Sequence, residues 1–172
     1  GIDHVLFVLL LLYLVRGFKN LLKVITSFTI AHSITLGLSA FQLVSVSQAP
    51  VEALIALSIA VLALEAFRPD TSLVNTYPWL MTFCFGLLHG LGFAGALNTI
   101  GLPETSLVSA LFLFNVGIEI GQLALIVVVL GSVALIGPAA GRIPAPLVRV
   151  PLYLIGGTAV FWFIDRTLPI LV

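Results

Sequence analysis

Apolar residues fill six long stretches of the chain, and short polar breaks separate them. All but the first come close to, or exceed, the roughly 20 residues that a helix needs to cross a bilayer. The pattern predicts an all-α protein, a polytopic membrane bundle of six transmembrane helices that forms a single transmembrane domain over residues 1–172. The six stretches are residues 1–15, 21–44, 51–67, 79–97, 105–136 and 147–168.

The first apolar stretch is short, and it begins at once at Gly1. It falls short of the roughly 20 residues that a complete span requires. We therefore expect the first helix to be N-terminally truncated and an upstream extracytoplasmic segment to be missing.

Composition narrows the class of protein further. Hydrophobic residues make up 60% of the chain and charged residues only 8%, whereas soluble domains carry about 25% charged residues. A soluble fold of this size could not hide so much apolar surface from water. The net charge is zero, which argues against a nucleic-acid partner. The lipid bilayer is thus the expected surrounding of the chain.

The basic residues predict the orientation in the membrane. Six of the seven follow the first, third and fifth helices, in connections that share one side, and only Arg166 lies on the other side. By the positive-inside rule these connections are cytoplasmic, so both termini are extracytoplasmic. We expect an integral protein of the bacterial inner membrane. The six residues are Arg16, Lys19, Lys23, Arg68, Arg142 and Arg149.

Ionisable residues lie inside these apolar stretches, where burial is costly and usually marks a function. His32 and His89 each lie eleven residues from the expected inner surface, or about 16 Å at the rise of an α-helix. Glu119 lies about 21 Å from the outer surface, less with tilt. These depths are near the middle of the bilayer, and Asp3 and His4 occupy its outer half.

Imidazole nitrogen and carboxylate oxygen together suit a divalent transition-metal ion, either Ni, Co, Zn or Cu. Asp3 and Glu119 would also neutralise its charge. The predicted metal ligands are Asp3, His4, His32, His89 and Glu119. The residues predicted to surround the ion or line its pathway are Thr29, Ser33, Asn115, Gln122 and Glu52.

Two glycine pairs predict where helices approach closely. Gly86 and Gly90 flank His89, and Gly117 and Gly121 flank Glu119. Small residues four apart allow two membrane helices to bring their backbones together. We therefore expect a close helix contact beside each of these ionisable residues.

Five motifs resemble the HupE/UreJ family, in residues, order and spacing. This family is associated with hydrogenase and urease accessory functions, and its studied members are nickel permeases. The resemblance implies that Asp3 and His4 end the family's His-x5-Asp-His motif, and that His89 belongs to its His-Gly element. The sequence after His89 is more similar to the broader second branch, whose members often carry an extracytoplasmic domain. The motifs are residues 1–4, 28–36, 52–58, 85–94 and 114–122.

Three functions remain open from the sequence. The first is a permease for a divalent cation of the nickel or cobalt type. The second is a membrane-embedded zinc-dependent hydrolase that uses the same histidines and acids to activate water. The third is a membrane anchor for the missing segment. Besides lipid and the metal ion, the expected partners are a second copy of the chain or a tethered extracytoplasmic domain.

Overall fold

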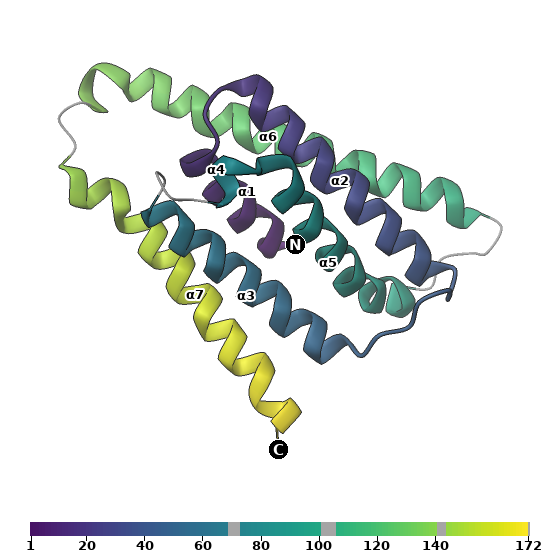
Figure 1. Cartoon of the computed structure of the whole chain (residues 1–172). Helices are drawn as coiled ribbons and strands as arrows, with labels where there is room; N and C mark the ends of the chain where they lie inside the picture. The colour runs from purple at the N-terminus through teal and green to yellow at the C-terminus, as the bar shows by residue number, and fades with distance from the viewer. Residues whose placement is uncertain (69–72, 101–105, 141–143, 172) are drawn as a thin grey trace.

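The computed structural model describes residues 1–68, 73–100, 106–140 and 144–171, and almost all of them are helical (Figure 1). No strand occurs in these ranges. The prediction of an all-α protein is therefore confirmed. The helices are α1 (Ile2–Leu14), α2 (Phe18–Ala40), α3 (Gln48–Phe67), α4 (Leu73–Thr76), α5 (Pro78–Ile100), α6 (Leu107–Ala140) and α7 (Ala145–Leu171).

Each predicted apolar stretch corresponds to one helix, and α4 is an additional single turn before α5. Four helices, α2, α3, α6 and α7, are long and apolar enough to cross a membrane. Helix α1 and the segment Pro78–Phe93 of α5 are apolar but shorter. Four spans are thus supported by length and composition, and the crossing of α1 and α5 stays a prediction.

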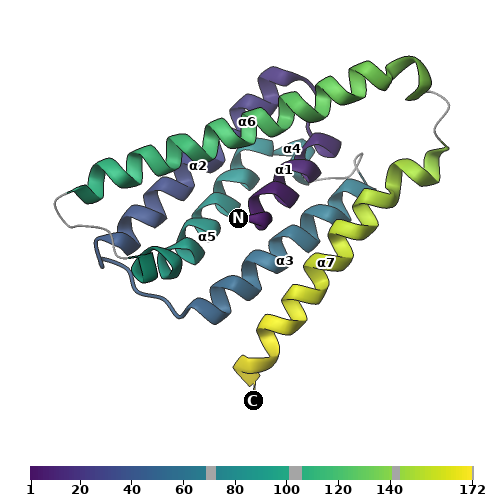
Figure 2. The ribbon, with the colours of Figure 1, turned by 180° about the vertical axis from the view of Figure 1, so that it is seen from behind.

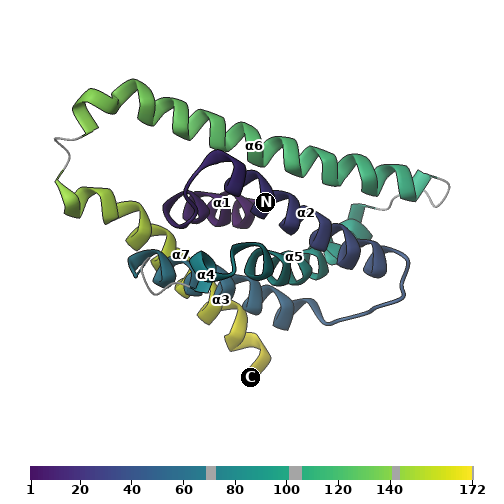
Figure 3. The ribbon, with the colours of Figure 1, turned by 45° about the horizontal axis from the view of Figure 1, so that its top comes forward.

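The helices pack as a row with α1 set into it. Helix α2 packs on α5, α5 packs on α3, and α3 packs on α7. Helix α6 lies along α2 at one edge of the molecule, and α7 lies along α3 at the other (Figures 1 and 2). Helix α1 contacts both α3 and α6, so the N-terminus lies in the middle of the bundle (Figure 3). The short first helix is therefore its central element.

The interior consists mainly of side chains from α1, α2 and α3. Phe7 and Leu10 of α1, Phe28 of α2 and Ile59 of α3 are fully buried. In contrast, long apolar side chains on α6 and α7, such as Leu135, are exposed. Apolar side chains on these edge helices suit contact with lipid, which is as apolar as they are.

Helices α2 and α5 approach closely because α5 has glycine where they meet. A Cβ atom on Gly86 would collide with the carbonyl oxygen of Phe28, and one on Gly90 with that of His32. The hydroxyl of Thr35 donates across this contact to the carbonyl oxygen of Leu87, at 2.7 Å. The close contact predicted at this glycine pair is therefore confirmed.

The second glycine pair makes no such contact within the described chain. Added Cβ atoms on Gly117 and Gly121 would meet nothing within 4 Å. The prediction of a close helix contact beside Glu119 is wrong at these positions, because the glycines point away from the neighbours of α6.

The end of α1, the start of α2, the end of α3 and the start of α7 lie at one end of the bundle (Figure 1). These are the helix ends that border the basic connections. Arg142 lies outside the described residues. The described basic residues of these connections thus lie at one end of the bundle, as the sequence predicts. Which side of the membrane this end faces stays a prediction.

Candidate functional site

Three helices bring the three histidines of the chain together. The ring centroid of His4 on α1 lies 5.3 Å from that of His32 on α2 and 5.4 Å from that of His89 on α5. Imidazoles bound to one ion at about 2.0–2.1 Å would have ring centroids about 5 Å apart. The spacing of these pairs therefore fits ligands of one metal ion.

The proton on His89 is fixed by its neighbour. Nδ1 of His89 lies 2.8 Å from the carbonyl oxygen of Phe85, one turn earlier in α5. A carbonyl oxygen can only accept, so Nδ1 carries the proton and donates. In the neutral ring, Nε2 then has a lone pair available for a ligand.

The same reasoning applies to His32 through Asn115 of α6. Nδ2 of Asn115 donates to the carbonyl oxygen of Leu111 at 2.8 Å, which sets the orientation of the amide. Its Oδ1 faces Nδ1 of His32 at 3.0 Å and accepts from it. Neutral His32 therefore also presents the lone pair of Nε2. A ring nitrogen held in this way is typical of metal-binding histidines.

Nothing in the described chain offers a hydrogen bond to Nε2 of His4, His32 or His89, although all three atoms are buried. Leaving a buried polar atom without a partner costs about 1–3 kcal/mol. As the side chains stand, no three His, Cys, Asp or Glu groups of the described residues already surround a metal position. The three Nε2 atoms are of a type that binds metal ions. Side chains would have to rotate to bring all three within bonding distance of one ion.

Aromatic rings enclose the histidines. The ring of Phe28 lies 5.5 Å from His4, 6.0 Å from His32 and 5.2 Å from His89, measured between centroids. Phe7 lies 5.5 Å from His89. His32 is fully buried and His89 is 2% exposed. These apolar walls lower the local dielectric constant and strengthen any interaction between the nitrogens and a cation.

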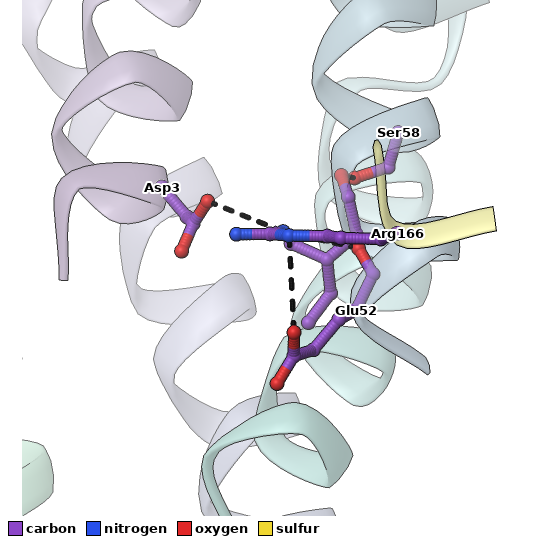
Figure 4. Close-up of polar contacts among 5 residues, drawn as sticks. Asp3, Glu52, Ser58 and Arg166 are labelled. Carbon is purple, nitrogen blue, oxygen red and sulfur yellow. Dashed lines mark hydrogen bonds and ion pairs between the residues drawn. The ribbon is translucent and has the colours of Figure 1, made fainter. Parts of the chain in front are cut away.

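Asp3, the predicted fourth ligand, faces Arg166 of α7 (Figure 4). Oδ1 of Asp3 lies 3.9 Å from Nη1 of Arg166, and Oε2 of Glu52 lies 3.8 Å from Nε of the same guanidinium. Glu52, at the start of α3, is one of the residues that the sequence predicts around the ion or along its pathway. Its side chain is 49% exposed, and it is also an ion-pair partner.

One cavity joins these charged residues to two of the histidines, His4 and His89. It has a volume of about 190 Å³, and Asp3, Glu52, Arg166, His4 and His89 all line it. The charged side chains are partly exposed, whereas His89 is buried. The cavity therefore leads from a charged opening to the partly buried imidazole of His4 and the buried imidazole of His89.

Glu119, the predicted fifth ligand, lies in a different place. Its Oε1 accepts a hydrogen bond of 2.7 Å from the hydroxyl of Thr26, between α6 and α2. A second cavity of about 270 Å³ is lined by Glu119 together with Thr29, Ser33 and Asn115. Asn115 thus borders this cavity while it contacts His32.

Three other predicted pathway residues belong to the same two helices: Thr29 and Ser33 lie on α2, and Gln122 lies on α6. The hydroxyl of Ser33 donates to the carbonyl oxygen of Thr29 at 2.7 Å. Gln122 is 5% exposed, and in the described part of the chain neither of its amide atoms has a hydrogen-bond partner. Ser33 and Thr29 line the second cavity on its α2 side, and their hydroxyl oxygens are possible ligands for a cation.

Sequence reasoning did not find the roles of Arg166 and Thr26. From the sequence, Arg166 is predicted only to lie on the side of the membrane opposite the other basic residues. Arg166 is the single basic residue predicted on a side of the membrane that otherwise carries acids, and this could have suggested an ion pair. Thr26 gave no such signal, because a hydroxyl in a membrane helix usually bonds to its own backbone.

Comparison with known proteins gives one match. A family model described as HupE / UreJ protein matches residues 1–166. No curated protein and no solved structure is similar enough to count as a match. The family match covers all the residues of both cavities.

Proposed function

The chain belongs to the HupE/UreJ family, and on that premise we propose that it is a permease for a divalent transition-metal ion of the nickel or cobalt type. The family suggests a membrane protein with an accessory or transport role for these metals. The observation that carries the proposal is the group of three histidines whose Nε2 atoms are buried and have no hydrogen-bond partner in the described residues.

In the proposed path, the ion enters at the charged opening and loses water as protein atoms replace it. Asp3 and Glu52 attract it, and their carboxylates favour a divalent charge over an anion. His4, His32 and His89 then bind it through Nε2. Nitrogen ligands hold nickel, cobalt, zinc and copper far better than calcium or magnesium.

The inward part of the path follows the interface of α2 and α6. Asn115 contacts His32 and lines the second cavity, so it connects the two regions. Glu119 and the hydroxyls of Thr29 and Ser33 provide oxygen ligands there. Weaker oxygen ligands after strong nitrogen ligands would allow the ion to leave, as conduction requires.

Metal uptake by cells that express the protein tests this proposal. We expect His32→Phe and His89→Phe to reduce nickel and cobalt uptake to the level of cells without the protein. Phenylalanine keeps an aromatic ring beside Phe28 and removes the nitrogens. Cys84→Ala, at an exposed cysteine, is the control and should leave uptake unchanged. Normal uptake in both histidine variants would refute the permease.

The zinc hydrolase is the alternative that uses the same histidines. A catalytic zinc site keeps three protein ligands and one water position. Metal analysis of purified protein separates the two functions: tightly retained zinc, one per chain, would favour the hydrolase, and a readily exchanged ion would favour transport.

A further inference from the structure

Arg166 occupies the place where an incoming cation would first meet the protein. Its guanidinium lies between the carboxylates of Asp3 and Glu52, and it lines the same cavity as His4 and His89 (Figure 4). The two carboxylates and the guanidinium together carry a net charge of −1. A divalent ion and Arg166 would thus compete for the same two acids.

The contacts of Arg166 with the acids are loose. Both ion-pair distances, 3.8 and 3.9 Å, exceed the roughly 2.7–2.9 Å of a charge-assisted hydrogen bond. The guanidinium has two other contacts that do not involve the carboxylates. It donates to the backbone carbonyl oxygen of Glu52 at 3.1 Å, and it lies 5.2 Å from the ring centroid of Trp162.

These contacts would hold Arg166 when the carboxylates turn to another cation. A guanidinium over an indole ring is stabilised without any carboxylate. The side chain is also 23% exposed, so water can solvate it on the open side of the cavity. Displacement from the acids therefore requires a small movement and no burial of an unpaired charge.

We propose that Arg166 is a resident counter-cation, which neutralises Asp3 and Glu52 while the site is empty and is displaced from them by the entering divalent ion. The proposal rests on the proposed metal permease. Arg166 thereby determines specificity, because a monovalent ion gains too little from the two acids to replace a guanidinium. It also sets the affinity of the opening for the ion.

Binding of Co²⁺ to the purified protein in detergent tests this proposal. We expect Arg166→Gln to tighten binding about tenfold or more, because a competing charge near 4 Å is removed. Arg166→Lys should stay near the wild type, and Asp3→Asn should weaken binding. Arg149→Gln, on the same helix at the other end, is the matched control. Arg166→Met keeps the apolar stem and serves as the second neutral variant.

A second measurement uses the wild-type protein. Phenylglyoxal modifies accessible arginines, and mass spectrometry gives the rate at each position. We expect Co²⁺ to accelerate the modification of Arg166 and to leave that of Arg149 unchanged. A rate at Arg166 that stays constant or falls while Co²⁺ binds would overturn the proposal.

The outcomes separate this proposal from the proposed function. If Co²⁺ binds to the wild type and His89→Phe abolishes binding, but neutral variants of Arg166 bind equally or more weakly, the permease stands and the counter-cation is refuted. If neither the wild type nor Arg166→Gln binds Co²⁺, Ni²⁺ or Zn²⁺, both are refuted. Binding that is detected only in Arg166→Gln would support the counter-cation directly.

Discussion

The imidazole of His32 donates from Nδ1 to Oδ1 of Asn115 at 3.0 Å, and this hydrogen bond joins α2 to α6 inside the bundle. It fixes the tautomer of the ring, so that Nε2 of His32 keeps its lone pair. Helix α6 otherwise exposes most of its apolar side chains. The main structural role of Asn115 is therefore to hold the ring of His32 rather than to pack α6 against its neighbours.

Replacing Asn115 should weaken metal binding without removing a ligand. Loss of a partner that orients a metal-bound histidine typically reduces affinity about 10- to 100-fold, and we expect this range for Co²⁺ with Asn115→Leu. Asn115→Asp keeps an acceptor and should retain most of the affinity. Ser132→Ala, at an exposed hydroxyl on the same helix, is the control. Equal affinity of Asn115→Leu and the wild type would show that the hydrogen bond does not orient His32.

A methyl group at Gly90 should destabilise the fold. Its Cβ would collide with the carbonyl oxygen of His32 and with Oγ1 of Thr35, so α5 would have to move away from α2. Overpacking of this kind costs about 1–3 kcal/mol, and we expect a lower melting temperature of Gly90→Ala by circular dichroism in detergent.

Gly131→Ala is the matched control for this variant. An added Cβ at Gly131, on α6, meets nothing within 4 Å. Alanine favours a helix over glycine by up to about 1 kcal/mol, so this variant should melt at the same temperature or higher. A Gly90→Ala protein as stable as the Gly131→Ala protein would refute the close contact of α2 and α5.

The meeting of the histidines could largely be anticipated from the sequence. The rise of a helix gives the depth of His32 and His89 from the helix ends, and these two side chains do lie close to His4. Depth alone does not give the rotation of a helix about its axis. Glu119 was expected beside the histidines, whereas α6 is turned so that it bonds to Thr26.

The ion pairs of Arg166 could not be predicted, for a different reason. They require both α7 and α1 to pack on α3, and no local pattern specifies which helices become neighbours. The sequence predicts Asp3 as a metal ligand and Glu52 as a residue near the ion or its pathway. Only the three-dimensional arrangement shows that they share one guanidinium.

Glu119 should affect transport more than equilibrium binding. Because it bonds to Thr26 and lines the second cavity, we expect Glu119→Gln to slow cobalt uptake several-fold while the affinity for Co²⁺ changes little. Thr26→Val should have a smaller effect in the same direction. Thr167→Val, whose hydroxyl donates within α7, is the control. A loss of affinity as large as that of His89→Phe would instead establish Glu119 as a ligand, as its depth in the sequence predicted.

The basic end of the bundle should face the cytoplasm. Membrane proteins retain lysine and arginine on that side, and Lys19 and Lys23 lie at the start of α2. In a Cys84→Ser background, a cysteine at Leu43, beyond the other end of α2, should react with a membrane-impermeant maleimide added to spheroplasts. A cysteine at Asn20 should react only after the membrane is permeabilised. Reaction at Asn20 in intact spheroplasts, with protection at Leu43, would reverse the orientation. It would then place the opening formed by Asp3, Glu52 and Arg166 on the cytoplasmic side, so the proposed path would run outward.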